Sequence, residues 1–238
     1  MNDKRLIVAL DVATMAKARA LVDELGDSVT YYKVGMELFY SVGGEIVRFL
    51  RNAGKEVFLD LKLHDIPNTV AQGTARLTRL GASILNVHAA GGRTMMRAAA
   101  IAVTDAATTL GIAKPKLIAI TILTSMDREE WTHMHPGSDI AGQVQLLARM
   151  AQEAGLDGVV ASPQEAGKIR AVCGQDFLIV TPGIRPQGAA LNDQSRTATP
   201  EFALSQGADY IVVGRPITKA DNPREAAEQI LQEMRRSQ

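Results

Sequence analysis

The chain alternates short apolar runs with longer segments rich in alanine and leucine. Most of the short runs are apolar throughout rather than at every second position, which is typical of parallel strands buried on both faces. Eight such runs are predicted as strands: Leu6–Val12, Val29–Val34, Val57–Leu63, Ser83–His88, Lys116–Leu123, Gly158–Ser162, Phe177–Pro182 and Tyr210–Gly214.

The segments between these runs have the composition and spacing of helices. A glycine closes several of them just before the next strand, as expected for a left-handed C-terminal cap. These glycines are Gly54, Gly81, Gly111, Gly155, Gly174 and Gly207. The predicted helices are Thr14–Leu25, Gly43–Asn52, Asn68–Leu80, Thr94–Leu110, Ile140–Ala154, Pro163–Val172, Pro200–Ser205 and Pro223–Arg235.

Repeated strand–helix units predict an α/β protein, specifically a (β/α)8 TIM barrel formed by residues 1–238 as one domain. A doubly wound open sheet is the alternative. Such a sheet usually carries a glycine-rich fingerprint after its first strand. Here that strand ends Ala9-Leu10-Asp11-Val12, without a G-x-G-x-x-G motif. The barrel is therefore the favoured architecture.

Composition narrows the class of protein. The 238 residues suit one barrel, and 26 Lys and Arg balance 26 Asp and Glu. A net charge of zero argues against nucleic acid polymers or an acidic membrane as the main partner. The apolar runs are too short to span a bilayer, and the one after Met1–Arg5 is too short for a signal peptide. The single cysteine, Cys173, fits a reducing, cytoplasmic setting.

Charged residues gather at the predicted carboxyl ends of the first three strands, the end where barrel enzymes hold their chemistry. Asp11 follows the first strand and Lys33 lies in the second. Asp60 and Lys62 lie two apart in the third, so they point to the same side, and Asp65 follows them. The sequence suggests an alternating set of Lys33, Asp60, Lys62 and Asp65, which is either an ion-pair network that holds the barrel closed or a catalytic array. Buried charges are better evidence for function than for stability, so we favour the array.

A second group, after strands seven and eight, has the features of a phosphate site. Gly183 and Arg185 open a long loop, and Gly214 and Arg215 follow the last strand. Glycine lets backbone N–H groups approach an anion, and arginine offers a planar fork to its oxygens. The alternative is that the glycines are turn residues and Arg215 a surface charge. Because a glycine and an arginine occur at matching positions after both strands, we favour phosphate binding.

The histidines are weaker candidates. His133 and His135 have metal-pair spacing, but they lie in a polar stretch with no third ligand nearby, which favours a loop. His88 ends an apolar strand and is expected to be a hydrogen-bonded barrel residue rather than a catalyst. We expect no metal site.

The segment Asp60-Leu61-Lys62-Leu63-His64-Asp65-Ile66-Pro67-Asn68-Thr69 resembles the orotidine 5′-phosphate decarboxylase family, with its D-x-K-x-x-D pattern. The resemblance spans the whole chain. It also includes Ala9-Leu10-Asp11, Lys33-Val34-Gly35, Thr124-Ser125-Met126, Thr181-Pro182-Gly183-Ile184-Arg185, Asp193-Gln194 and Val213-Gly214-Arg215-Pro216.

The resemblance implies a homodimeric barrel lyase that makes uridine 5′-phosphate and carbon dioxide without a metal or organic cofactor. It implies Lys62 as proton donor, in an array with Lys33, Asp60 and Asp65. Asp65, Ile66 and Thr69 would reach the partner subunit's site. Asp11 and Lys33 would contact the ribose, and Thr124, or the adjacent Ser125, the pyrimidine. The residues implied at the phosphate are Gln194 and Arg215, with Pro182, Gly183, Arg185 and Gly214 nearby.

Two rival interpretations remain open. Related barrel enzymes that act on sugar phosphates, such as keto-gulonate phosphate decarboxylase or hexulose phosphate synthase, share D-x-K-x-x-D but use Mg²⁺. Ile66-Pro67-Asn68-Thr69 and the loop with Arg185 and Gln194 favour the pyrimidine enzyme instead. A non-catalytic phosphate-binding barrel would need Arg215 but would leave the Lys/Asp array unexplained.

Overall fold

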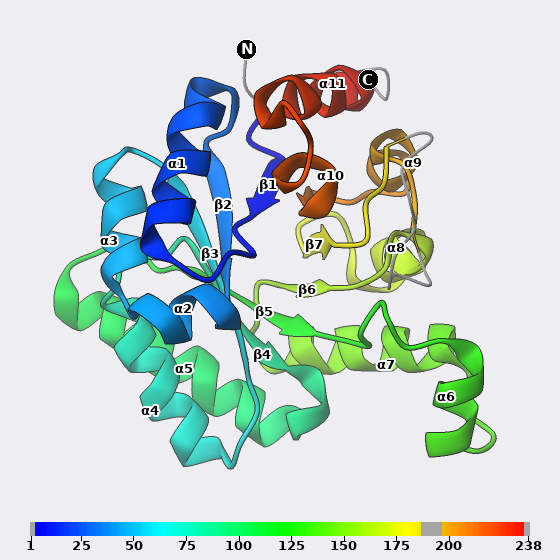
Figure 1. Cartoon of the computed structure of the whole chain (residues 1–238). Coiled ribbons are helices and arrows are strands. Elements are labelled where there is room, and N and C mark those ends of the chain that lie inside the picture. Colours follow the sequence, from blue (N-terminus) through cyan, green and yellow to red (C-terminus); the bar gives the residue numbers. More distant parts are fainter. Residues whose placement is uncertain (1–2, 187–196, 236–238) are drawn as a thin grey trace.

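Eight parallel strands pair in chain order and close into a barrel in this computed structural model, which describes residues 3–186 and 197–235 (Figure 1). Closure is made where the first strand pairs with the last, with Leu6 opposite Ile211 and Val8 opposite Val213. The predicted (β/α)8 TIM barrel is confirmed. The strands are β1 (Leu6–Ala9), β2 (Tyr31–Gly35), β3 (Glu56–Leu63), β4 (Ile84–His88), β5 (Lys116–Ile120), β6 (Gly158–Val160), β7 (Leu178–Thr181) and β8 (Tyr210–Val213).

The helices cover the outside of the barrel, as Figure 1 shows. Those predicted from the sequence are found within a few residues of their expected bounds: α1 (Met15–Leu25), α3 (Glu45–Asn52), α4 (Pro67–Thr78), α5 (Gly92–Leu110), α7 (Ile140–Glu153), α8 (Pro163–Cys173), α9 (Pro200–Ser205) and α11 (Pro223–Arg235). Five shorter elements were not predicted: α2 (Met36–Val42), α6 (Arg128–Met134), α10 (Arg215–Thr218) and the 3₁₀ turns η1 (Gly26–Ser28) and η2 (Ala89–Gly91). Across the described ranges, no helix has the length and apolar character needed to cross a membrane.

Alternation along each strand creates two apolar cores. In β1, Leu6 and Val8 point outward to the helices, whereas Ile7 and Ala9 point into the barrel. The outer core packs strands against helices. The inner core fills the barrel below the site and consists of Ile7, Ala9, Tyr31, Phe58, Ile84, Ile118, Val180 and Val212.

Glycine is required at one point of contact between two neighbouring strands. A Cβ on Gly158 in β6 would collide with the carbonyl oxygen of Leu178 in β7. Glycine also ends the helices as predicted: Gly111, after α5, has φ 62° in the left-handed region and donates its N–H to Ala107.

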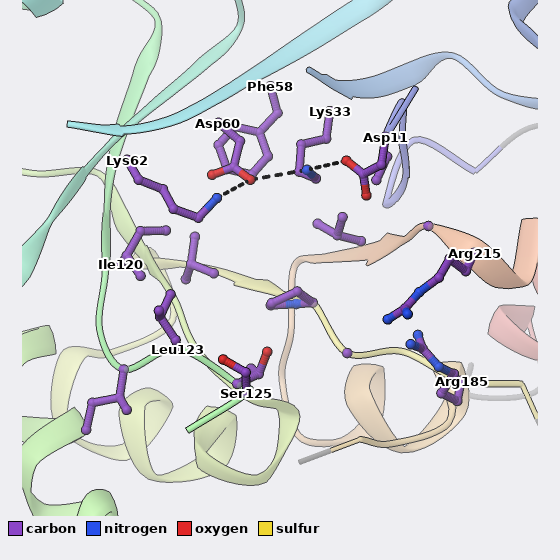
Figure 2. A pocket seen from close by; sticks show the side chains of 18 residues that line it. Asp11, Lys33, Phe58, Asp60, Lys62, Ile120, Leu123, Ser125, Arg185 and Arg215 are labelled. Carbon is purple, nitrogen blue, oxygen red and sulfur yellow. Dashed lines mark hydrogen bonds and ion pairs between the residues drawn. The ribbon is translucent and has the colours of Figure 1, made fainter. Parts of the chain in front are cut away.

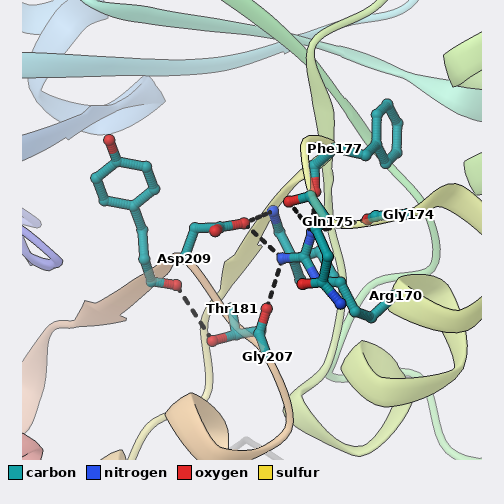
Figure 3. A network of polar contacts seen from close by, with 9 residues as sticks. Arg170, Gly174, Gln175, Phe177, Thr181, Gly207 and Asp209 are labelled. Atoms are coloured by element: carbon teal, nitrogen blue, oxygen red, sulfur yellow. Dashed lines mark hydrogen bonds and ion pairs between the residues drawn. The ribbon is translucent and has the colours of Figure 1, made fainter. Parts of the chain in front are cut away.

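An arginine network ties the amino-terminal ends of β7 and β8 to α8 (Figure 3). The Arg170 guanidinium lies 2.8 Å from the Asp209 carboxylate, which also accepts the N–H of Ile179. Arg170 further donates to the carbonyl oxygens of Gly174, Gln175, Phe177 and Gly207. The network holds the amino-terminal ends of β7 and β8, and the carboxyl-terminal ends of these strands lead to Arg185 and Arg215.

Candidate active site

Four charged side chains of alternating sign line one wall of a cavity of about 260 Å³ at the carboxyl ends of the strands (Figure 2). Asp11 Oδ1 lies 3.2 Å from Lys33 Nζ, and Lys33 Nζ lies 3.3 Å from Asp60 Oδ2. The same Asp60 oxygen lies 2.8 Å from Lys62 Nζ. Three members of the predicted array, Lys33, Asp60 and Lys62, are therefore brought together, but Asp11 rather than Asp65 completes the row within this chain.

Asp60 and Lys33 are largely buried, which strengthens the interaction between their charges. The Asp60 side chain is 8% exposed and that of Lys33 14% exposed. Burial opposes ionisation of Asp60, but Lys33, Lys62 and Asn86 together hold the pKa of its carboxyl below its usual value. Burial likewise opposes the charged form of Lys33, yet Asp60 and Asp11 raise the pKa of its ammonium above the ordinary value. Each charge keeps its neighbour ionised.

The backbone at Lys62 is unusual. Its φ is 53°, the single positive φ of a non-glycine residue in the part of the chain that the structure describes. The Lys62 N–H donates to Asn86 Oδ1 at 2.8 Å, and Asn86 Nδ2 donates to Asp60 Oδ1 at 2.6 Å. Asn86 was missed in the sequence, where its only signal was a polar amide inside the apolar run of β4.

Arg185 and Arg215 also line the cavity, and in Figure 2 both guanidinium groups lie on the side away from Lys62. Arg185 is 7% exposed and donates to its neighbouring carbonyl oxygen on Ile184. Gly183, with φ 76°, makes the turn after β7 that brings Arg185 inward. Pro182, Gly183 and Gly214 also line the cavity, as predicted. Gln194 lies outside the described residues.

The cavity lining also includes Thr124 and Ser125, predicted as alternatives at the pyrimidine. Thr124 is 8% exposed, and both side chains line the cavity.

The apolar floor was missed in the sequence. It was nevertheless encoded by strand alternation, because Ala9, Phe58 and Val212 each lie two residues before a polar or glycine position of the site. The remaining apolar lining residues are Ile120, Ile122, Leu123 and Val160.

Three predicted residues do not line this cavity. Asp65, Ile66 and Thr69 are exposed at and just after the loop between β3 and α4. Asp65 Oδ1 accepts the N–H of Ile66 at 2.6 Å, and Ile66 is 66% exposed despite being apolar.

The histidines form no metal site. His133 lies in α6 rather than in a loop, and His135 stacks on Trp131 with ring centroids 4.1 Å apart. Among the residues described, no cluster of His, Cys, Asp or Glu is arranged to hold a metal ion. His88 packs against His64 at 5.5 Å between centroids. Burial, with His64 and Lys62 nearby, lowers the pKa of His88.

The chain is similar to known proteins over nearly its whole length. The sequence model described as "Orotidine 5'-phosphate decarboxylase / HUMPS family" matches residues 4–230. The orotidine 5′-phosphate decarboxylase of Moorella thermoacetica is 49% identical over 231 residues, covering 97% of this chain and 92% of the relative. That of Carboxydothermus hydrogenoformans is also 49% identical, covering 97% and 96%. The crystal structure of orotidine 5′-phosphate decarboxylase from Lactobacillus acidophilus superposes with a TM-score of 0.85 at 42% identity, covering 98% of this chain and 99% of that chain.

Proposed function

Since the chain belongs to the orotidine 5′-phosphate decarboxylase / HUMPS family, we propose that it converts orotidine 5′-phosphate to uridine 5′-phosphate and carbon dioxide, as a step of pyrimidine synthesis. The observation that carries the proposal is the shared cavity: an alternating Asp/Lys wall at one end and two arginines at the other. A substrate with a carboxylate at one end and a phosphate at the other matches both. The relatives named above, all orotidine 5′-phosphate decarboxylases, favour this substrate over a sugar phosphate.

In the proposed reaction, the bond between C6 and the carboxylate carbon breaks and carbon dioxide leaves. The electron pair stays on C6, where no adjacent carbonyl can delocalise it. Lys62 supplies a positive charge at this carbon and then transfers a proton from Nζ to it, giving uridine 5′-phosphate. Solvent reprotonates the lysine. Because Lys62 Nζ lies 2.8 Å from Asp60, the ammonium is already held in place before substrate binds.

Asp60 serves this reaction chiefly by preorganisation. Its carboxylate orients both lysines, so little rearrangement is needed as charge develops on C6. Its negative charge also lies where the substrate carboxylate would approach, which disfavours the bound carboxylate relative to the carbanion. The array supports either contribution.

The arginine end holds the phosphate, with Arg215 and Arg185 as donors, and Gln194 is proposed with them. Phosphate binding energy realised far from C6 is then available to close the loop after β7 over the site. Asp11 and Lys33 would contact the ribose, and Thr124 the pyrimidine.

We further propose a homodimer in which Asp65, Ile66 and Thr69 complete the partner's site. Support comes from their exposure outside this chain's own cavity and from the exposed apolar side chains of Ile66, Met36 and Tyr40. A cytoplasmic location fits the single, buried Cys173.

The test is an absorbance assay that follows loss of orotidine 5′-phosphate, with and without a chelator. We expect turnover that the chelator does not change. Absence of turnover by the folded protein would contradict the proposal, and chelator-sensitive turnover of a sugar phosphate would replace it with the Mg²⁺-dependent alternative.

Lys62→Ala tests the proposed proton donor. We expect kcat to fall by at least about 10²–10⁴-fold, the usual contribution of a general acid, with the fold intact. Lys116→Ala is the matched control, because it removes a strand lysine paired with Asp157 at the opposite end of the barrel. Near-normal kcat in Lys62→Ala would rule out the assigned role.

A further inference from the structure

The pairing between β3 and β4 is irregular where the catalytic array begins. Leu59 pairs with Leu85, but the next pair is Leu63 with Val87, so β3 advances four residues while β4 advances two. Asp60 and Lys62 lie in this bulged stretch. A bulge removes regular ladder hydrogen bonds and redirects side chains, and such irregularities are frequent beside active sites.

Asn86, in β4, faces the bulge and is 2% exposed. Its single amide group makes two bonds to β3. Oδ1 accepts the backbone N–H of Lys62 at 2.8 Å, and Nδ2 donates to Asp60 Oδ1 at 2.6 Å. One side chain therefore fixes the backbone of the lysine and the carboxylate of the aspartate together.

The backbone that Asn86 holds is one that lysine rarely adopts. Lys62 has φ 53°, and a side chain with a Cβ is disfavoured in this left-handed region. Such a conformation persists when surrounding contacts over-determine it, and these positions cluster at functional sites. The bond from the Lys62 N–H to Asn86 is one such contact, and it bears directly on where Nζ points.

The two oxygens of the Asp60 carboxylate have different partners, and Asn86 binds one of them. Oδ2 faces both ammonium groups, Lys33 from β2 and Lys62 from β3, while Oδ1 faces the Asn86 amide from β4. The other charged or titratable groups around the carboxylate are His88 in β4 and, beyond Lys33, Asp11 after β1. The amide is thus the neutral donor that keeps the carboxylate plane turned toward the two lysines.

We propose that Asn86 is a positioning residue for the reaction, which sets the orientation of Asp60 and Lys62 without touching the substrate. The inference rests on the proposed decarboxylase function.

Asn86→Ala tests it, with Ser83→Ala as the matched control. Ser83, immediately before β4, repeats the same bridge at the opposite end of the barrel: its hydroxyl donates to the Glu56 carboxylate and accepts the Val57 N–H. Both variants lose one bridge from β4 to β3, but Ser83 is far from the cavity. Thermal unfolding, kcat, KM and the pH dependence of kcat are measured for both.

We expect Asn86→Ala to lower kcat by about 10- to 100-fold, the usual effect of removing a partner that orients a reactive group, with little change in KM. We also expect the acidic limb of the kcat profile to move to higher pH, because Asp60 loses a donor that favours its ionised form. Ser83→Ala should lower the melting temperature while leaving kcat and the pH profile unchanged.

Asn86→Asp is the second variant, and it decides the question if Asn86→Ala does not fold. It is isosteric and keeps an acceptor for the Lys62 N–H, but places a second carboxylate against Asp60 Oδ1. Two carboxylates this close share a proton, so the acidic limb should move up by at least about one pH unit.

The two proposals fail in different ways. If the wild type does not decarboxylate orotidine 5′-phosphate, the proposed function is wrong. If the wild type is active and folded Asn86 variants keep its kcat and acidic limb, the role of Asn86 alone is overturned. A purely structural role would give the Asn86 variants the Ser83→Ala pattern.

Discussion

A single carboxylate oxygen connects the charges of the cavity. Asp60 Oδ2 lies within 3.3 Å of Lys33 Nζ and 2.8 Å of Lys62 Nζ. Removing this anion takes from the Lys33 and Lys62 ammonium groups the carboxylate that they share, while Lys33 keeps its pairing with Asp11. The charge of Asp60 is therefore expected to stabilise the folded state, and the proposed reaction depends on the same charge.

This arrangement predicts how stability depends on pH. Because the pKa of Asp60 is lowered in the folded state, its contribution is present above its ordinary value of 3.8 and is lost as pH falls through the lowered value. Asp60→Asn should cost about 3–5 kcal/mol at neutral pH, and the difference from wild type should shrink in acid. Chemical denaturation across pH measures this.

Asp157→Asn is the control for that measurement. Asp157 also has a lowered pKa, opposed by burial and caused by Lys114, the Leu117 N–H and Lys116, but it lies at the opposite end of the barrel. It should lose stability and retain kcat. A pH-independent difference between Asp60→Asn and wild type would contradict the assigned charge state.

Arg215 should recognise phosphate specifically. Hydrogen bonds to charged groups are worth about 1.5–3 kcal/mol, so Arg215→Ala should weaken uridine 5′-phosphate binding by about 10- to 100-fold and leave uridine binding unchanged. Calorimetric titration of both ligands measures the difference. Lys219→Ala removes an exposed positive charge outside the cavity lining and should affect neither. Equal losses for both ligands would show that Arg215 does not bind phosphate.

At the scale of elements, a single guanidinium group connects the amino-terminal ends of β7 and β8. Arg170 bridges α8 to both strands through carbonyl oxygens and Asp209 (Figure 3). Its side chain is 10% exposed. We expect Arg170→Ala to lower the free energy of unfolding by about 3 kcal/mol, because it leaves the part-buried carbonyl oxygens of Phe177 and Gly207 without this donor and removes the guanidinium paired with Asp209.

Arg170→Lys provides the comparison. Lysine keeps the charge but cannot reach several acceptors with one planar fork, so it should recover less than half of the lost stability. Denaturant titration of both variants tests this, and full recovery by lysine would show that charge alone matters.

Much of the fold was predictable because the signals were local. Apolar runs located every strand, and glycines such as Gly111 marked helix ends. α2 was missed because Gly35 begins it without a side-chain cap, and its aromatic and β-branched residues also suit a strand. α6 carried a usable signal: Asp127 caps it by accepting the Glu130 N–H.

The same distinction between local and non-local signals applies to the residues of the site. Lys33, Asp60 and Lys62 were predictable together because parallel strands end at one edge of a barrel, whereas Asp65, predicted with them, does not line this chain's cavity and Asp11 lies there beside Lys33. Asn86 was not predictable, since its proposed role depends on a β3–β4 bulge, and the register between two strands separated by a helix leaves no local sequence pattern.

At the scale of the whole molecule, the proposed dimer makes each site a product of two chains. Mixing Lys62→Ala chains with Asp65→Ala chains tests this, because one site of each mixed dimer then receives both intact residues. Each variant alone should be nearly inactive, and the statistical mixture should recover about a quarter of wild-type activity.

The control mixes Lys62→Ala with Lys33→Ala. Both residues line the cavity of their own chain. Each of the two sites in a mixed dimer therefore carries one substitution, so no activity should return. Failure of the first mixture, with subunit exchange verified, would show that Asp65 acts within its own chain.

Trp131 is the only tryptophan among the 238 residues, and it lies 6% exposed in α6, with its ring stacked on His135 and its N–H donated to the Ser138 carbonyl oxygen. Figure 1 shows α6 set apart from the barrel, a few residues after Thr124 and Ser125. The protein therefore carries an intrinsic fluorophore on the segment that follows Thr124 and Ser125 in the cavity lining. Stopped-flow emission on mixing with uridine 5′-phosphate would time the response of that segment without any attached dye.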